Sequence, residues 1–133
     1  GSATLFQLTK TPATDGEFVF KGGLFQRRGA GNDYTISGKD ITFLAAPVNG
    51  ANIEIFHFQA LGGMVFTRDT FEGNGAITDF SLTGSPVLGG LFVFRGGAFQ
   101  RDAGNDFSFL FGSTISFVTP PAIGINLEVR YFG

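Results

Sequence analysis

The sequence predicts an all-β protein made of two tandem antiparallel β-sandwich-like modules that arose by internal duplication. Most of the chain consists of two similar copies of one sequence, and equivalent residues such as Phe18 and Phe92 are 74 positions apart. Gly-Gly pairs separate short apolar runs in both copies, as at the two-residue turns of β-hairpins. The 133 residues also include 18 Phe and 21 Gly, a composition that favours many short strands divided by turns.

The duplication extends over nearly the whole length that the two copies share. The matching segments are Phe6–Pro12 with Phe80–Pro86, Phe18–Arg27 with Phe92–Arg101, Gly31–Tyr34 with Gly104–Phe107, Ile41–Phe43 with Ile115–Phe117, and Pro47–Phe58 with Pro121–Phe132. The spacing shifts by one residue around the Gly-Asn-Asp segment. Agreement in this order identifies a repeat, and we expect one module at residues 3–59 and a second at residues 64–133.

The first hairpin of each copy surrounds its Gly-Gly pair. In the first copy, strands at Phe18–Lys21 and Leu24–Gln26 flank Gly22 and Gly23. The second copy has Gly96 and Gly97 in the same place. We expect all four glycines to adopt positive φ, which glycine does at little cost.

The remaining strands follow in order. In the first copy we expect a hairpin of Asp33–Ile36 with Asp40–Phe43 around Gly38-Lys39, and then a last strand at Asn52–Phe58 after the turn at Pro47–Gly50. The equivalent strands of the second copy are expected at Phe107–Phe111, Thr114–Val118 and Asn126–Phe132.

One strand has no counterpart in the first copy. Between the copies, Met64–Phe71 is expected to form a strand that leads into another at Ile77–Leu82. We interpret the acidic segment Asp69–Gly75 as a turn, because it lacks the acidic spacing of a calcium loop. Since the first copy has no equivalent of residues 64–74, we expect its leading strand to be missing and one sheet edge to be open.

Composition excludes several classes of function. The net charge is −2 with charges scattered singly, so the basic patch of a nucleic-acid-binding protein is missing. No apolar stretch approaches the roughly 20 residues of a membrane-spanning helix, and we expect no membrane insertion. The chain has no Cys, and hence no disulfide and no Cys metal site. Gly1-Ser2 is typical of a tag remnant, which predicts that residues 3–133 are a fragment of a longer protein.

No residue pattern indicates catalysis or a cofactor. His57 is the only histidine, and its counterpart in the second copy is Tyr131, so we expect a structural role for this position. Gly-x-Gly sequences do not lead from a parallel strand into a helix, so a dinucleotide site is excluded. We therefore expect a protein that is not an enzyme, with no catalytic, cofactor-binding or metal-binding residues.

Two Asn-Asp pairs are candidate turn residues. They are Asn32-Asp33 and Asn105-Asp106, at equivalent positions of the two copies. We expect the carboxylates to accept hydrogen bonds from nearby backbone N–H groups. Calcium ligation is the alternative, since carboxylate and amide oxygens suit that ion.

The candidate interface residues are aromatic and basic. Phe6, Phe56 and Phe58 lie in the copy with the open edge, and Arg27 and Arg101 follow the first hairpin of each copy. Because Phe56 is replaced by arginine in the second copy, we expect it to be buried in a contact specific to the first. The arginines are interpreted as solvated charges, or as partners for carboxylates or an acidic glycan.

Residues 69–132 resemble a module that recurs in virion proteins of tailed bacteriophages. The resemblance rests on the order of Asp69-Thr70-Phe71, Gly73-Asn74-Gly75, Phe80-Ser81-Leu82, Ser85-Pro86, Phe92-Val93-Phe94, Gly96-Gly97, Gln100, Asp106-Phe107-Ser108 and Pro121–Gly124. Such modules typically carry Asn-Gly at the hairpin turn where this chain has Gly-Gly. That difference preserves the turn geometry but removes a polar side chain.

The resemblance implies a structural protein of the virion, such as a component of a tail fibre, appendage or decoration, with a role in host attachment. The implied partners are other virion proteins and a host surface glycan or receptor. From the open edge we expect association of identical copies, with a trimer as the expected homo-oligomer.

Two other classes of function remain open. The first is a cell-surface adhesin or filament subunit that assembles by strand pairing. The second is a carbohydrate-binding module, although the chain has no Trp and only two Tyr for stacking on sugars.

Overall fold

A computed structural model describes residues 1–59, 62, 65–87, 89–110 and 112–133. It divides into two compact units, Gly1–Gly62 (unit 1) and Gly63–Gly133 (unit 2). The regular elements of the described residues are all β-strands, and every pairing between them is antiparallel. This confirms the predicted all-β fold class. No helix in this part of the chain could span a membrane.

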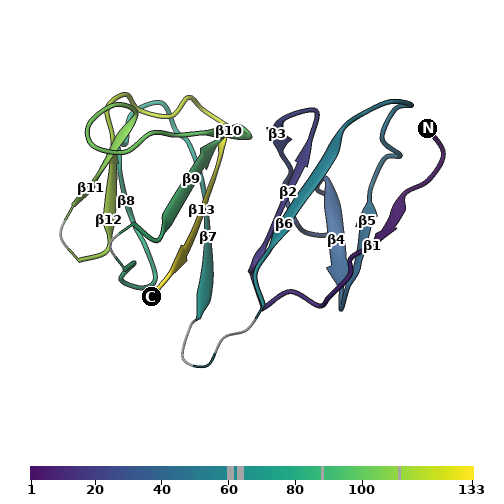
Figure 1. The fold of residues 1–133 in the computed structure, drawn as a ribbon. Coiled ribbons are helices and arrows are strands. Elements are labelled where there is room, and N and C mark those ends of the chain that lie inside the picture. Colours follow the sequence, from purple (N-terminus) through teal and green to yellow (C-terminus); the bar gives the residue numbers. More distant parts are fainter. Residues whose placement is uncertain (60–61, 63–64, 88, 111) are drawn as a thin grey trace. The chain divides into compact units, whose positions relative to one another are not determined.

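Unit 1 contains two three-stranded sheets. Its strands are β1 (Leu5–Gln7), β2 (Glu17–Lys21), β3 (Leu24–Phe25), β4 (Tyr34–Ser37), β5 (Asp40–Phe43) and β6 (Ile53–His57). The sheets have the orders β1-β5-β4 and β3-β2-β6 (Figure 1). Both predicted hairpins are present, as β2–β3 and β4–β5. Strand β1 was not predicted, although Phe6 aligns with Phe80 of the predicted strand at Ile77–Leu82.

Unit 2 repeats this arrangement and adds one strand. Its strands are β7 (Phe66–Glu72), β8 (Asp79–Ser81), β9 (Leu91–Arg95), β10 (Ala98–Phe99), β11 (Phe107–Leu110), β12 (Thr114–Phe117) and β13 (Asn126–Phe132). The sheets have the orders β10-β9-β13-β7 and β11-β12-β8. Met64 and Phe111, with which two predicted strands begin and end, lie outside the described residues.

The interpretation of Asp69–Gly75 as a turn was wrong for its first four residues. Asp69 to Glu72 belong to β7 and pair with β13 in continuous register, with Asp69 opposite Val129 and Glu72 opposite Asn126. The predicted strand at Met64–Phe71 already included Asp69–Phe71, and pairing with β13 extends it through Glu72.

Each unit packs its two sheets around an apolar core. In unit 1 the buried residues Val19, Tyr34, Ile41 and Phe43 come from both sheets. Their counterparts in unit 2 belong to a larger cluster, which comprises Phe80, Leu82, Val93, Phe107, Ile115, Phe117, Leu127, Val129 and Tyr131. Alternation along β6 directs Ile53 and Ile55 toward the core.

The Gly-Gly turns join β2 to β3 and β9 to β10. Gly22 and Gly23 have φ of 58° and 82°, and Gly96 and Gly97 have φ of 57° and 84°. Two successive positive values define a type I′ turn, whose twist matches that of the flanking strands.

We expect Gly23→Val and Gly97→Val each to destabilise their unit by about 1–3 kcal/mol, because a β-branched residue is strained at positive φ. Urea denaturation followed by circular dichroism measures the effect. Gly62→Val is the control and should change stability little, because Gly62 has no positive φ and has open space where a Cβ would lie. Unchanged stability of both turn variants would contradict the assignment of these turns.

Candidate functional site: the open edge of unit 1

Strand β6 ends its sheet, whereas the equivalent strand of unit 2 does not. The two strands correspond because β6 pairs with β2 through Val19 opposite Ile55, and β13 pairs with β9 through Val93 opposite Val129. Strand β13 has β9 on one side and β7 on the other, while β6 has only β2 among the described strands. We call the side of β6 that faces away from β2 the open edge.

The open edge presents backbone donors and acceptors. The carbonyl of Asn52 accepts a hydrogen bond from Gly22 N at 2.8 Å, and Phe58 N donates to the carbonyl of Gly16 at 2.9 Å. Both groups point toward β2. Because backbone direction alternates along an antiparallel strand, the N–H and C=O groups of Ile53, Ile55 and His57 (the intervening residues) point to the open edge. A further strand can pair with them.

In unit 2 this place is filled by β7, and a buried carboxylate ties β7 to the rest of the unit. Asp69 accepts hydrogen bonds from Thr83 N at 2.9 Å, Thr83 Oγ1 at 2.9 Å and Tyr131 Oη at 2.8 Å. Tyr131 Oη also accepts a bond from Gly84 N at 2.8 Å. Burial raises the pKa of Tyr131, and the hydrogen bond to Asp69 adds to the increase, so the hydroxyl remains a donor at neutral pH.

Unit 1 keeps the donors of this cluster but has no equivalent of Asp69. Thr9 corresponds to Thr83, and His57 corresponds to Tyr131. The Nδ1 atom of His57 is buried and has no hydrogen-bond partner among the described residues. A buried ring nitrogen without a partner is costly, so the open edge contains a polar group that no described residue of unit 1 satisfies.

The three aromatic candidates lie in different environments. Phe56 is 53% exposed and Phe58 is 42% exposed, although each touches one ring of β2: Phe20 and Phe56 are 6.1 Å apart, as are Phe18 and Phe58. Phe56 is thus largely exposed in the single chain, and its burial in a contact specific to the first copy stays a prediction. Phe6 is half-buried and packs edge-on against Phe43 at 5.6 Å, so it belongs to the border of the core.

The basic candidates do not join this group. Arg27 follows β3, at the opposite edge of the sheet from β6. Arg101 lies in unit 2, where its side chain is largely exposed and bonded to Asp106 at 3.1 Å. The structure therefore brings the predicted arginines near turn carboxylates and not near the open edge.

The Asn-Asp pairs hold turns. Asp33 Oδ2 accepts from Arg27 N at 2.7 Å, and Asp106 Oδ2 accepts from Arg101 N at 2.8 Å. Hydrogen bonds from the Arg101 side chain and backbone lower the pKa of Asp106. The amide groups of the two asparagines donate to backbone carbonyls within the same turns: Asn32 to Arg28 at 3.1 Å and Asn105 to Asp102 at 2.8 Å. In the described part of the chain, no group of three or more His, Asp or Glu side chains is arranged to hold a metal ion.

A second polar cluster occurs in unit 1 alone. Glu17 is buried, and its Oε1 accepts hydrogen bonds from Arg28 Nη1 at 3.0 Å and from Tyr34 Oη at 3.1 Å. Asp15 also forms an ion pair with Arg28. The unit 2 residues at the aligned positions of Glu17 and Tyr34 are Leu91 and Phe107. Carboxylate and hydroxyl are thus replaced together, as expected for a buried pair whose members satisfy each other.

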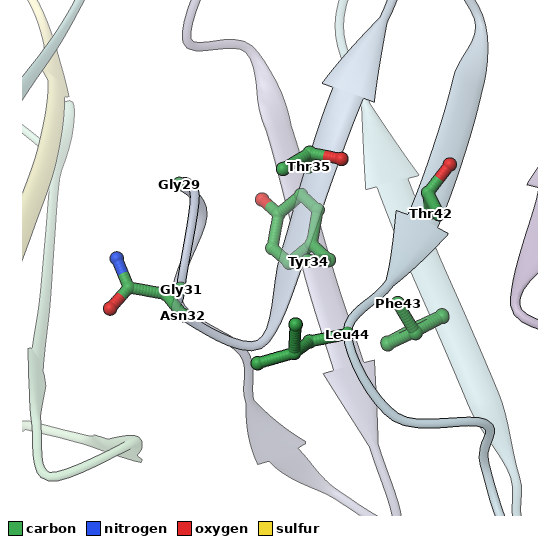
Figure 2. Close-up of a pocket in the computed structure, with 8 residues that line it drawn as sticks. All are labelled: Gly29, Gly31, Asn32, Tyr34, Thr35, Thr42, Phe43 and Leu44. Carbon is green, nitrogen blue, oxygen red and sulfur yellow. The ribbon is translucent and has the colours of Figure 1, made fainter.

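A shallow pocket of about 190 Å³ lies beside β4 and β5 (Figure 2). Its lining consists of Gly29, Gly31, Asn32, Tyr34, Thr35, Thr42, Phe43 and Leu44. These residues offer amide and hydroxyl groups but no charge to orient an ionic ligand or a reacting group. We therefore place the functional site at the open edge.

Sequence reasoning missed the cluster of Asp69, Thr83 and Tyr131. Two signals pointed to it: the threonine is retained in both copies, and a ring with a polar tip stands at both His57 and Tyr131. What could not be seen was the carboxylate they share, because Asp69 lies in the strand that only one copy has.

Comparisons with known proteins add no family. No protein-family model matches the chain, and no curated protein is similar to it at a significant level.

Proposed function

We propose that this protein is a non-enzymatic structural component of a bacteriophage virion that assembles through the open edge of β6. Two features of β6 together carry the proposal. The backbone N–H and C=O groups of Ile53, Ile55 and His57 face away from β2, and the rings of Phe56 and Phe58 are exposed. The resemblance of residues 69–132 to phage virion modules supports a place in a tail fibre, appendage or decoration.

Edge pairing is physically sufficient for assembly. A sheet edge with free donors and acceptors is a template for another strand. Burying one phenylalanine ring contributes roughly 2 kcal/mol, so Phe56 and Phe58 add an apolar contribution to the backbone bonds. Identical copies commonly close such contacts by symmetry, and we expect a homo-oligomer with three copies. Other virion proteins and a host surface glycan or receptor are the further partners of this proposal.

A cell-surface adhesin or filament subunit is the second candidate. The same open edge favours it, because strand addition at an exposed edge is a general mode of recognition. The neighbouring genes distinguish the two: capsid and tail genes support the virion, and secretion or anchoring genes support the cell surface.

The association itself is tested by light scattering at high micromolar concentration. We expect the wild-type chain to be an oligomer and Phe56→Asp to dissociate it, because the substitution places a charge on the apolar surface beside the open edge. Val48→Asp, at a residue of the same unit that is 76% exposed, is the matched control and should leave the oligomer intact.

Arg130, which aligns with Phe56, is an unsuitable control. It is buried, and its Nε donates to Glu128 at 2.7 Å, so its replacement would destabilise unit 2. A wild-type chain that remains monomeric would contradict self-assembly through β6.

A further inference from the structure

We infer that the open edge of unit 1 binds an extended strand of the β7 type, whose inward-facing aspartate occupies a site formed by His57 and Thr9. This inference rests on the proposed role of β6 as an assembly edge, and it names the chemistry of the strand that β6 receives. The strand has the pattern Phe-x-Arg-Asp-x-Phe found at residues 66–71.

The register of β7 on β13 shows where each residue of such a strand would lie. Thr67, Asp69 and Phe71 stand opposite Tyr131, Val129 and Leu127. The residues 74 positions earlier are His57, Ile55 and Ile53, whose backbone groups face the open edge. An added strand in the same register would place its aspartate opposite Ile55, two positions from His57 on the same face of the strand.

The inward face of the open edge suits a carboxylate at that position. In unit 2 the carboxylate of Asp69 has three donors, from Thr83 and Tyr131. Thr9 retains the backbone N–H and the hydroxyl of Thr83, and the imidazole of His57 replaces the hydroxyl of Tyr131. His57 Nδ1 is buried without a partner among the described residues, and an imidazole N–H is a good donor to a carboxylate.

The two phenylalanines of the pattern also find counterparts. In unit 2, Phe66 packs edge-on against Phe132 at 4.9 Å, and Phe71 packs against Phe80 at 5.3 Å. The aligned residues of unit 1 are Phe58 and Phe6. An added strand would therefore cover the exposed ring of Phe58 and extend the core border at Phe6.

The arginine of the pattern fits the outer face. Arg68 lies opposite Arg130 and forms an ion pair with Glu128 at 2.9 Å. In unit 1, Glu54 takes the place of Glu128, and the exposed ring of Phe56 takes the place of Arg130. An incoming arginine can therefore form an ion pair with Glu54 and a cation–π contact with Phe56, and it no longer lies opposite another arginine.

Pairing of β6 with β6 of a second copy meets these requirements less well. An antiparallel pair centred on Ile55 would place His57 opposite Ile53 and Glu54 opposite Phe56 of the other copy. Such a contact supplies no carboxylate to accept a hydrogen bond from His57 and no basic side chain to pair with Glu54. The polar groups at the edge therefore favour a strand of the β7 type, which carries both an aspartate and an arginine.

The experiment uses the full chain and a synthetic peptide of residues 65–75, with NMR detection of the His57 ring. His57 is the only histidine, so its imidazole signals report on unit 1 alone. We expect saturable shifts of these signals and slower exchange of the Ile53, Ile55 and His57 amides. A peptide with Asp69→Asn should bind at least about tenfold more weakly, since a hydrogen bond to a charged group is worth about 1.5 kcal/mol or more.

Two controls make the outcome decisive. His57→Phe in the protein should remove most of the difference between the aspartate and asparagine peptides, whereas a merely structural role of His57 would weaken both peptides equally. A peptide of residues 52–59 tests pairing with β6 itself.

Equal affinity of the aspartate and asparagine peptides, tighter binding of the 52–59 peptide, or no binding of any peptide would each overturn the inference. The proposed self-assembly fails separately, if the chain is monomeric in light scattering while the 65–75 peptide binds.

Discussion

Replacement of Asp69 by alanine is expected to lower the free energy of unfolding of unit 2 by about 2–4 kcal/mol. The carboxylate is only 8% exposed and accepts three hydrogen bonds, from Thr83 N, Thr83 Oγ1 and Tyr131 Oη. Its removal leaves buried donors without an acceptor, and each such group costs about 1–3 kcal/mol before the structure relaxes. The same loss weakens the attachment of β7 to β13.

Chemical denaturation followed by circular dichroism measures this effect. Glu72→Ala provides the matched control, because Glu72 is an exposed acidic residue of the same strand and its replacement should change stability by less than about 0.5 kcal/mol. Tyr131→Phe, which removes one donor and keeps the ring, should have an effect between the two. An Asp69→Ala variant as stable as Glu72→Ala would show that the carboxylate does not anchor β7.

The features that the sequence predicted well are those set by local pattern. Positive φ at both Gly-Gly turns favours glycine, and the short apolar runs beside these turns form the predicted strands. Because the two copies repeat the same turns and the same runs, each supports the interpretation of the other. The all-β class and most strand positions follow from these two signals.

The features that it missed depend on residues far apart in the chain. Asp69 and Tyr131 are 62 positions apart, so the hydrogen bond between them has no local signal, although the strand that contains Asp69 was predicted. Glutamate is usually a surface residue. Glu17 is nevertheless buried, and Arg28 and Tyr34 donate hydrogen bonds to its carboxylate. Such pairings are set by tertiary packing, which outweighs local preference.

His57 Nδ1, which no described residue satisfies, links these two observations. A comparison of the copies alone suggests that position 57 accepts any ring with a polar tip. The contacts of Tyr131 show what that tip does in unit 2: it donates to a carboxylate from an added strand. On the inference made above, His57 is the corresponding donor of unit 1 to the strand that β6 receives.

Truncation of the two equivalent core isoleucines should have the other large effect. Ile41 and Ile115 are aligned in the repeat and are both 0% exposed. Ile41→Ala and Ile115→Ala each remove three side-chain carbons from a fully buried position. Such substitutions lower the free energy of unfolding by about 2–5 kcal/mol. Ile123→Ala is the matched control, since Ile123 is 82% exposed and its truncation should cost less than about 0.5 kcal/mol.

The consequence should differ between the units, although the substitution is the same. Unit 1 lacks the strand that completes unit 2, and a domain of about 60 residues is marginal in stability. We therefore expect Ile41→Ala to unfold most of unit 1 at 37 °C, with collapse of the dispersion of its amide NMR signals. Ile115→Ala should leave unit 2 folded but with a lower denaturation midpoint. If addition of the 65–75 peptide restores the unit 1 signals of Ile41→Ala, strand binding and stability are coupled as mass action requires. If Ile115→Ala unfolds unit 2 while Ile41→Ala leaves unit 1 folded, the open edge does not limit the stability of unit 1.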